Sequence, residues 1–269
     1  MNDFLQLFSY GFFQKALLAT LFASLSCGIT GTYIVSRRIV FISGGITHAS
    51  FGGIGLAFLM GFNPLVGAAI FSVISAIGIQ FFAEKGGIRE DSSIAIWWSM
   101  GMALGVIFVF LTPGYSPNLM SYLFGNILTV TGEEIWAMFV LNIVLIAVFW
   151  YWFRNILYIA FDEEFARVSG LPVTFFNYLV VILIALTVVL NIRVVGIILI
   201  LSLLTIPQAT ANLFTKDFRK MIFLSAGFAF IGTITGLVVS YFLNIPSGAT
   251  IIFVLIIFFG FIRVLKSVL

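Results

Sequence analysis

Charged residues are scarce in this sequence: Lys, Arg, Asp and Glu together make up 9% of the 269 residues, whereas 62% are hydrophobic. The chain has one cysteine and one histidine. A soluble domain needs a much more polar surface, so the composition predicts an all-α polytopic membrane protein that lies in the lipid bilayer. The single cysteine excludes a disulfide within the chain and argues against a cysteine-based metal site.

Several functional motifs are also missing. The sequence has no GxxxxGK[ST] loop, the motif that cradles nucleotide phosphates. If ATP drives this protein, a separate chain must bind it. We therefore expect no cofactor on this chain and ATP–Mg on a partner. The formal charge of +3 is small, and we expect no nucleic-acid partner.

Catalytic and proton-carrying groups are absent from the apolar runs. No carboxylate lies in the middle of such a run, which argues against a proton-driven secondary transporter. A hydrolase built on the only histidine, His48, would need an activated serine, and nothing in the sequence marks one. We expect no catalytic residues and a transport subunit rather than an enzyme.

Apolar runs long enough to cross the membrane fill most of the chain. A spanning helix needs about 20 apolar residues. The expected spans are 16–35, 40–60, 65–82, 93–111, 135–153, 173–190, 194–214, 221–243 and 249–262. Segment 119–130 is too short and lies between turn signals, so we expect it to be re-entrant or interfacial. The sequence thus predicts one transmembrane domain over 1–269, a bundle of eight or nine helices.

The basic residues are distributed unevenly between the loops. If the spans alternate in direction, nearly all Lys and Arg lie on one side of the membrane, and only Lys15 and Arg193 lie on the other. Cytoplasmic loops carry this excess of positive charge. We therefore expect a multi-pass protein of the plasma or inner membrane whose C-terminus is cytoplasmic.

The stretch 44–57 contains His48 within a series of small residues. On a helix, residues three and four apart share a face. His48 then lies on one face with Gly44, Gly52 and Gly55, beside a second small-residue stripe. Such stripes let other helices approach closely in lipid. His48 is a candidate metal ligand inside the bundle, and the pattern is equally compatible with a neutral, hydrogen-bonded histidine.

The longest polar stretch, 154–172, contains a predicted short helix. Asp162 is a suitable N-cap, Glu163 and Glu164 suit the first turn, and Gly170 suits the end. Phe165 and Ala166 contribute to an apolar side. The pattern alone favours an ordinary amphipathic loop on the membrane surface, and the alternative is a docking helix for a soluble partner.

A third stretch combines polar side chains with a proline. Ser202, Thr205 and Gln208 are three residues apart, so on a continuous helix they share a face. Pro207 removes a backbone hydrogen bond and predicts a kink. A kinked helix with a polar stripe suits a water-lined path, and it equally suits plain hydrogen bonding between helices.

Taken in order, these stretches resemble the permease subunits of zinc/manganese-type ABC importers. Each piece alone is weakly specific, whereas the ordered set is specific and runs along nearly the whole chain. The matching pieces are 17–38, 44–57, 123–128, 162–170, 194–211 and 245–249.

The resemblance implies a permease subunit of an ATP-driven importer of a divalent metal ion (zinc, manganese or iron), powered by separate ATPase subunits. It implies a homodimer, cytoplasmic ABC ATPase subunits and an extracytoplasmic metal-binding protein as partners. His48 would contact the metal ion. The translocation path would be lined by Thr47, Ser50, Ser202, Thr205 and Gln208. The ATPase-coupling helix would comprise Asp162, Glu163, Glu164, Phe165, Ala166 and Gly170.

One position departs from the family pattern. Many members carry an aspartate four residues before the histidine, where this chain has Gly44. The imidazole of His48 then lacks a carboxylate neighbour on its own helix. The alternatives are therefore an ABC permease for a chelated metal or another small solute, and an ATP-independent secondary transporter.

Overall fold

The computed structural model describes residues 10–113, 125 and 127–268, and within these residues the regular structure is entirely helical. The all-α prediction is confirmed. The elements are α2 (Gly11–Ser36), α3 (Phe41–Met60), α4 (Pro64–Glu84), α5 (Glu90–Leu111), η1 (Ile127–Thr129), α7 (Gly132–Tyr151), α8 (Phe153–Phe161), α9 (Glu163–Val168), α10 (Val173–Val195), α11 (Ile197–Leu203), α12 (Ile206–Phe214), α13 (Phe218–Leu243) and α14 (Ser247–Val268).

Nine helical segments in the described part of the chain are long and apolar enough to cross a membrane. Each overlaps one of the nine expected spans, with α11 and α12 together forming one of them. The longest runs were predicted best because their length and apolarity are local properties of the sequence. Most of the expected re-entrant segment 119–130 lies outside the described residues, and η1 is the helical piece described there.

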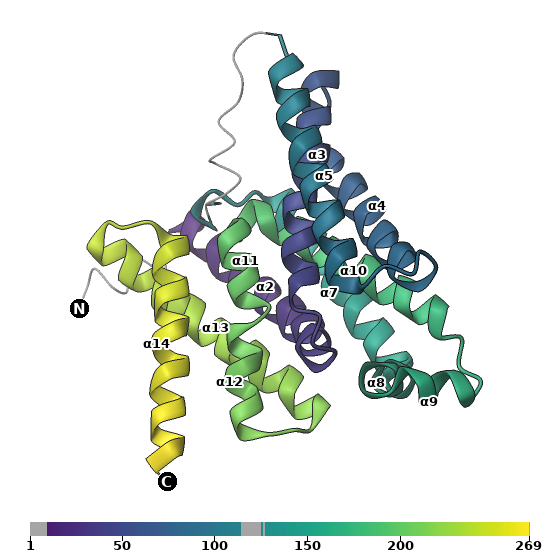
Figure 1. Cartoon of the computed structure of the whole chain (residues 1–269). Helices are drawn as coiled ribbons and strands as arrows, with labels where there is room; N and C mark the ends of the chain where they lie inside the picture. The colour runs from purple at the N-terminus through teal and green to yellow at the C-terminus, as the bar shows by residue number, and fades with distance from the viewer. Residues whose placement is uncertain (1–9, 114–124, 126, 269) are drawn as a thin grey trace. The chain divides into compact units, whose positions relative to one another are not determined.

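The chain divides into two compact units (Figure 1). One contains nearly all of α2, most of α7, the end of α10, and α11 to α14. The other contains α3 to α5, α8, α9 and most of α10. The expectation of a single transmembrane domain over 1–269 stays a prediction.

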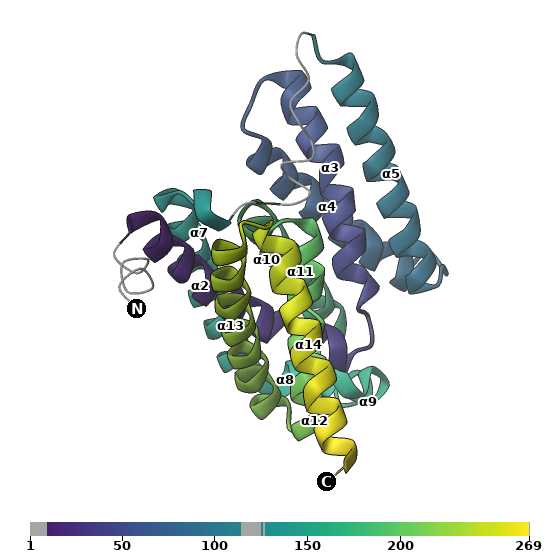
Figure 2. The same cartoon turned by 90° about the vertical axis from the view of Figure 1, so that its left-hand side faces the viewer.

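In the unit that carries His48, α3 packs along both α4 and α5 (Figures 1 and 2). Glycines make these contacts close: Gly53 meets the backbone of Gly67, and Gly101 meets the backbone of Ala49. A Cβ added at Gly55 would lie 2.6 Å from the carbonyl oxygen of Gly105. The predicted small-residue stripes of α3 therefore serve as backbone contact surfaces, and 78% of its spanning window is buried.

In the other unit, a helix break separates α11 from α12. Thr205 precedes α12, and Pro207 lies in the first turn, where a missing N–H costs no intrahelical hydrogen bond. The sequence predicted a kink at Pro207, and the structure has a complete interruption of the helix just before this residue. The α12, α13 and α14 helices pack against one another beyond it.

The outer faces of several helices are strongly apolar. Only 17% of the spanning window is buried in both α5 and α14, and 28% in α7. On α5 the exposed side chains include Phe110, which is 87% exposed. Apolar surface of this extent suits lipid or another membrane chain.

The close contact between α3 and α5 gives a first prediction. In Gly101→Val, the new Cβ would lie 2.6 Å from the carbonyl oxygen of Ala49, so the two helices must separate. We expect a loss of about 1–3 kcal/mol in unfolding free energy, as for other overpacked cores. Thermal unfolding of the purified chain in detergent measures this loss.

Gly227→Val on α13 is the matched control, because nothing lies within 4 Å of the added Cβ there. We expect this control to change the unfolding free energy by less than about 0.5 kcal/mol. Equal losses in the two variants would contradict the prediction.

Candidate functional site

His48 lies on α3 with its ring stacked on an aromatic side chain of α5. The centroids of the His48 and Trp98 rings are 4.4 Å apart, and the rings are inclined by only 6°. Phe51, on α3 itself, is 6.4 Å away at 20°. Stacking covers the face of an imidazole and leaves its two nitrogens, which lie in the ring plane, available at the edges. The Trp98 contact therefore fixes the plane in which His48 can bind.

The nitrogens of His48 have no competing partner in the described part of the chain. Its Nδ1 is buried and makes no hydrogen bond there. A histidine that was merely structural would be expected to use this atom, because an unpaired buried polar group costs free energy. A neutral imidazole nitrogen is also a metal ligand. The geometry is thus compatible with an imidazole that binds a metal ion transiently.

The hydroxyl groups next to His48 on α3 bond within their own helix. Thr47 Oγ1 donates to the carbonyl oxygen of Ser43, and Ser50 Oγ donates to that of Thr47 at 2.6 Å. Both side chains are fully buried. Their roles in a translocation path stay predictions.

The described residues form no complete metal site within one chain. Among them, no group of three or more His, Cys, Asp or Glu side chains is placed to hold a metal ion. Gly44, where a carboxylate would help His48, is buried in α3.

Gln208 is fully buried and makes hydrogen bonds across the helix break. Its Nε2 donates to the carbonyl oxygens of Cys27, at 2.8 Å, and Leu203, at 3.1 Å. Its side chain also lies against Gly31 of α2. Gln208 thereby satisfies the carbonyl of Leu203 at the end of α11 and connects α12 to α2 through the carbonyl of Cys27. This is the interhelical bonding that the sequence left as one of two interpretations.

Ser202 lies in α11, before this interruption, and Thr205 lies within the interruption. Each hydroxyl donates to a carbonyl four residues earlier, at 3.3 Å for Ser202 and 2.8 Å for Thr205. The face that they share with Gln208 on a continuous helix is not continuous here, because α11 ends at Leu203 and α12 begins at Ile206. A path along the three residues stays a prediction.

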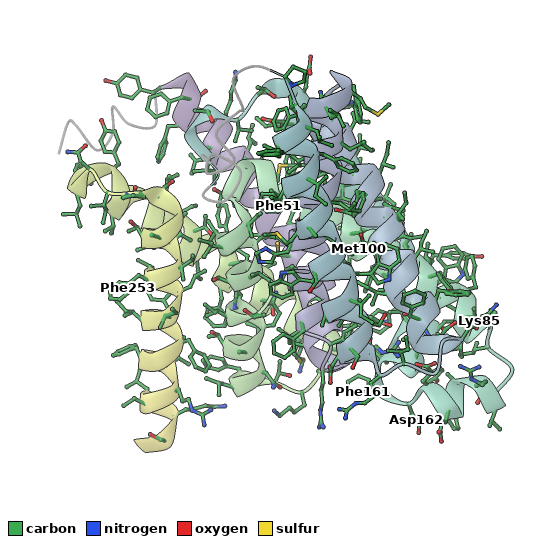
Figure 3. All side chains as sticks on the ribbon, turned by 45° about the horizontal axis from the view of Figure 1, so that its top comes forward. Phe51, Lys85, Met100, Phe161, Asp162 and Phe253 are labelled. Carbon is green, nitrogen blue, oxygen red and sulfur yellow. The ribbon has the colours of Figure 1, made fainter. Side chains whose placement is uncertain are left out.

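The polar loop contains two short helices, α8 and α9 (Figure 3). Asp162 caps α9, with Oδ1 accepting from the backbone N–H of Phe165 at 2.9 Å. Glu163 and Glu164 occupy the first turn, and Gly170 follows the helix at a φ of +80°. The predicted short helix and both of its ends are confirmed, since capping depends on residues close together in sequence.

The exposed residues of α9 include two apolar side chains besides the charged Glu164 and Arg167. Phe165 is 56% exposed and Val168, three residues later, is 88% exposed. Ala166 is fully buried and packs α9 onto the chain. Val168 is three residues after Phe165, so the two side chains share one face of α9, which agrees with the apolar side expected for this loop.

Comparisons with known proteins agree with this fold over nearly the whole chain. The model of the ABC 3 transport family matches residues 9–266. A membrane protein of Synechocystis is 42% identical over 93% of this chain and 89% of its own length. The manganese transport system membrane protein MntC of Listeria innocua is 35% identical over 94% of this chain and 90% of its own.

A solved structure, PsaBC of Streptococcus pneumoniae in complex with a Fab, has a TM-score of 0.85 to this chain. The two are 31% identical, and the match covers 97% of this chain and 94% of the other. Together with the nine apolar helices of the described residues, these matches identify a multi-pass membrane protein. The chain belongs to the ABC 3 transport family, as the membrane permease subunit of a transporter whose ATPase is a separate chain.

Proposed function

We propose that this permease carries a divalent metal ion into the cell, with manganese as the first cargo to test and zinc and iron as competitors. The observation that carries the proposal is the match to a protein named as a manganese transport permease, 35% identical over 94% of this chain. The metal ion is the transported substrate. ATP–Mg is bound by the partner ATPase, and this chain holds no cofactor.

His48 is the proposed contact for the ion on its way through. The Trp98 stack holds the ring, and once the helices around it open and expose the buried, unpaired Nδ1, this atom can bind a cation without breaking an existing hydrogen bond. Binding by one imidazole is weak, and weak binding suits conduction because the ion must leave again. Zinc accepts imidazole readily, whereas manganese favours oxygen ligands that water or a hydroxyl can supply.

A chelated metal is the second candidate cargo. The observation that favours it is the lack of a three-ligand cluster among the described residues, together with Gly44 beside His48. A chelate brings its own ligands and needs fewer from the path. An ATP-independent secondary transporter, the other alternative from the sequence, does not fit a family of ABC permeases.

The proposed assembly is a homodimer of this chain with two ATPase subunits and an extracytoplasmic metal-binding protein. Dimerisation would bring two copies of His48 toward one path. The ATPase would dock on α9 through Phe165 and Val168, whose exposed apolar side chains fit a partner groove. Lys and Arg gather at the loops on this side, which supports a cytoplasmic α9 and C-terminus.

The role of His48 gives a transport prediction. His48→Ala removes the only imidazole, and we expect ATP-dependent uptake of labelled manganese to fall by at least about tenfold, the loss expected for one metal contact. Manganese uptake is measured with and without ATP in cells that lack the native chain and produce the variant. Uptake of labelled zinc and iron by the same cells is measured for comparison.

Met60→Ala, on the same helix, is the control for His48→Ala. Met60 is 69% exposed at the end of α3, and we expect wild-type uptake from this variant. Full manganese uptake by His48→Ala would remove His48 from the path. No ATP-dependent uptake of any bare ion by the wild-type chain would shift the proposal to a chelate.

Docking on α9 gives a second prediction. Phe165→Ala removes a ring that is 56% exposed, and we expect the ATPase to bind about 30-fold more weakly or more, as for other interface aromatic anchors. Co-purification and ATP hydrolysis by the reconstituted complex report the loss. Phe253→Ala on α14, which removes a ring that is 65% exposed, is the control (Figure 3). Unchanged ATPase binding in Phe165→Ala would rule out docking through this face.

A further inference from the structure

Four side chains from separate segments meet beside α9 and form what we name the Asn177 cluster: Arg37, Glu84, Glu163 and Asn177. The Arg37 guanidinium donates to Asn177 Oδ1 at 2.7 Å and forms an ion pair with Glu163. Asn177 Nδ2 donates to Glu84 at 3.1 Å and to Glu163 at 3.3 Å. A single amide therefore connects both carboxylates and the guanidinium.

Each member of the cluster belongs to a different part of the fold. Glu163 is the first residue of α9, and Glu84 is the last residue of α4. Arg37 lies in the short link before α3, which begins at Phe41 and carries His48. Asn177 lies on α10. The cluster thus joins α9 to the ends of the helices that are packed tightly through glycine.

Burial separates this cluster from an ordinary surface ion pair. Asn177 is 2% exposed, and the side chains of Arg37 and Glu163 are 18% and 29% exposed. The Arg89–Asp91 pair, at 3.5 Å, has side chains that are 85% and 73% exposed. Partly buried, hydrogen-bonded charges are screened less by water and salt, whereas exposed pairs contribute little.

A cavity of about 550 Å³ lies next to the cluster, lined by Arg37, Glu84 and Glu163 among others. The buried Ala166 packs α9 onto the chain. The polar contacts of Asn177 and Arg37 hold Glu163, the first residue of α9, at the edge of this cavity. The cavity also leaves room for these side chains to move together when α9 is displaced.

We propose that Arg37 and Asn177 are positioning residues that transmit the displacement of α9 to α3 and α4, and so to the helix that carries His48. The inference rests on the proposed docking of the ATPase on α9. When the ATPase moves α9, Glu163 moves Arg37 at the start of α3, and Asn177 holds Glu84 at the end of α4. Breaking these contacts lets α9 move alone, and ATP is then hydrolysed without transport.

A charge exchange in the reconstituted transporter tests this coupling. Arg37→Glu and Glu163→Arg each place like charges together, and we expect manganese transported per ATP hydrolysed to fall by about tenfold in each. The double variant restores opposite charges between positions 37 and 163 but loses the pair of Glu163 with Arg167, so we expect it to recover to within about threefold of wild type and not fully. Arg89→Asp, Asp91→Arg and their combination are the matched controls and should leave the ratio within about twofold.

The outcomes separate the inference from the proposed function. Unchanged ratios in the single variants, or losses that the double variant does not relieve, would overturn the inference. If Phe165→Ala also leaves ATPase binding intact, docking on α9 fails as well. If Phe165→Ala abolishes binding while the charge variants stay coupled, only the inference fails. Where a charge reversal prevents assembly, Arg37→Lys and Glu163→Gln replace it and are judged by the same ratio.

A second measurement does not depend on the cargo. Nitroxide labels at Phe41→Cys, on α3, and Ser169→Cys, after α9, lie at exposed positions outside the cluster. We expect their separation to stay constant when ATP is trapped in the wild-type complex, because the two helices move together. In Arg37→Glu the distance distribution should broaden or shift with ATP. A distance that changes equally in both complexes would contradict coupling through Arg37.

Discussion

Close backbone contact between α3 and its neighbours α4 and α5 is the constraint on which the His48 unit depends. Lipid tails are as apolar as the helix surfaces, so burying apolar area gives little reason for helices to associate in a membrane. Glycine removes the side chain, and the backbones approach until they touch, as Gly55 does at Gly105. Many weak attractions act at this distance, and the three helices behave as one packed body.

That packing explains why His48 has a defined setting. Since Gly101 rests on the backbone of Ala49, α5 lies close enough for Trp98 to cover the imidazole face. The stack limits rotation of the ring, and its Nδ1 is buried without a hydrogen bond among the described residues. If His48 meets the ion, as we propose, a single imidazole would bind it weakly, and weak binding permits release.

The α9 helix is short and is held by fewer contacts, which are the packing of buried Ala166 and the directional polar contacts of Glu163 with Arg37 and Asn177. Phe165 and Val168 are exposed on it. An element held by few contacts beside a cavity can shift at modest cost, whereas the glycine-packed helices resist deformation. If the ATPase docks on α9, as we propose, displacement of α9 would act on the stiff group of helices that carries His48.

The sequence by itself determined the features that depend on near neighbours. The length of the apolar runs specified the membrane spans. Asp162 specified the start of α9, because it accepts a hydrogen bond from Phe165 only three residues later. The spacing of the glycines specified that α3 is closely packed. Only the tertiary structure decided that Trp98 covers His48, that Arg37 pairs with Glu163 126 residues away, and that Gln208 bonds to Cys27 181 residues away. The physical reason is that nearly every face of a membrane helix is apolar, so hydrophobic periodicity does not specify which helix lies beside which.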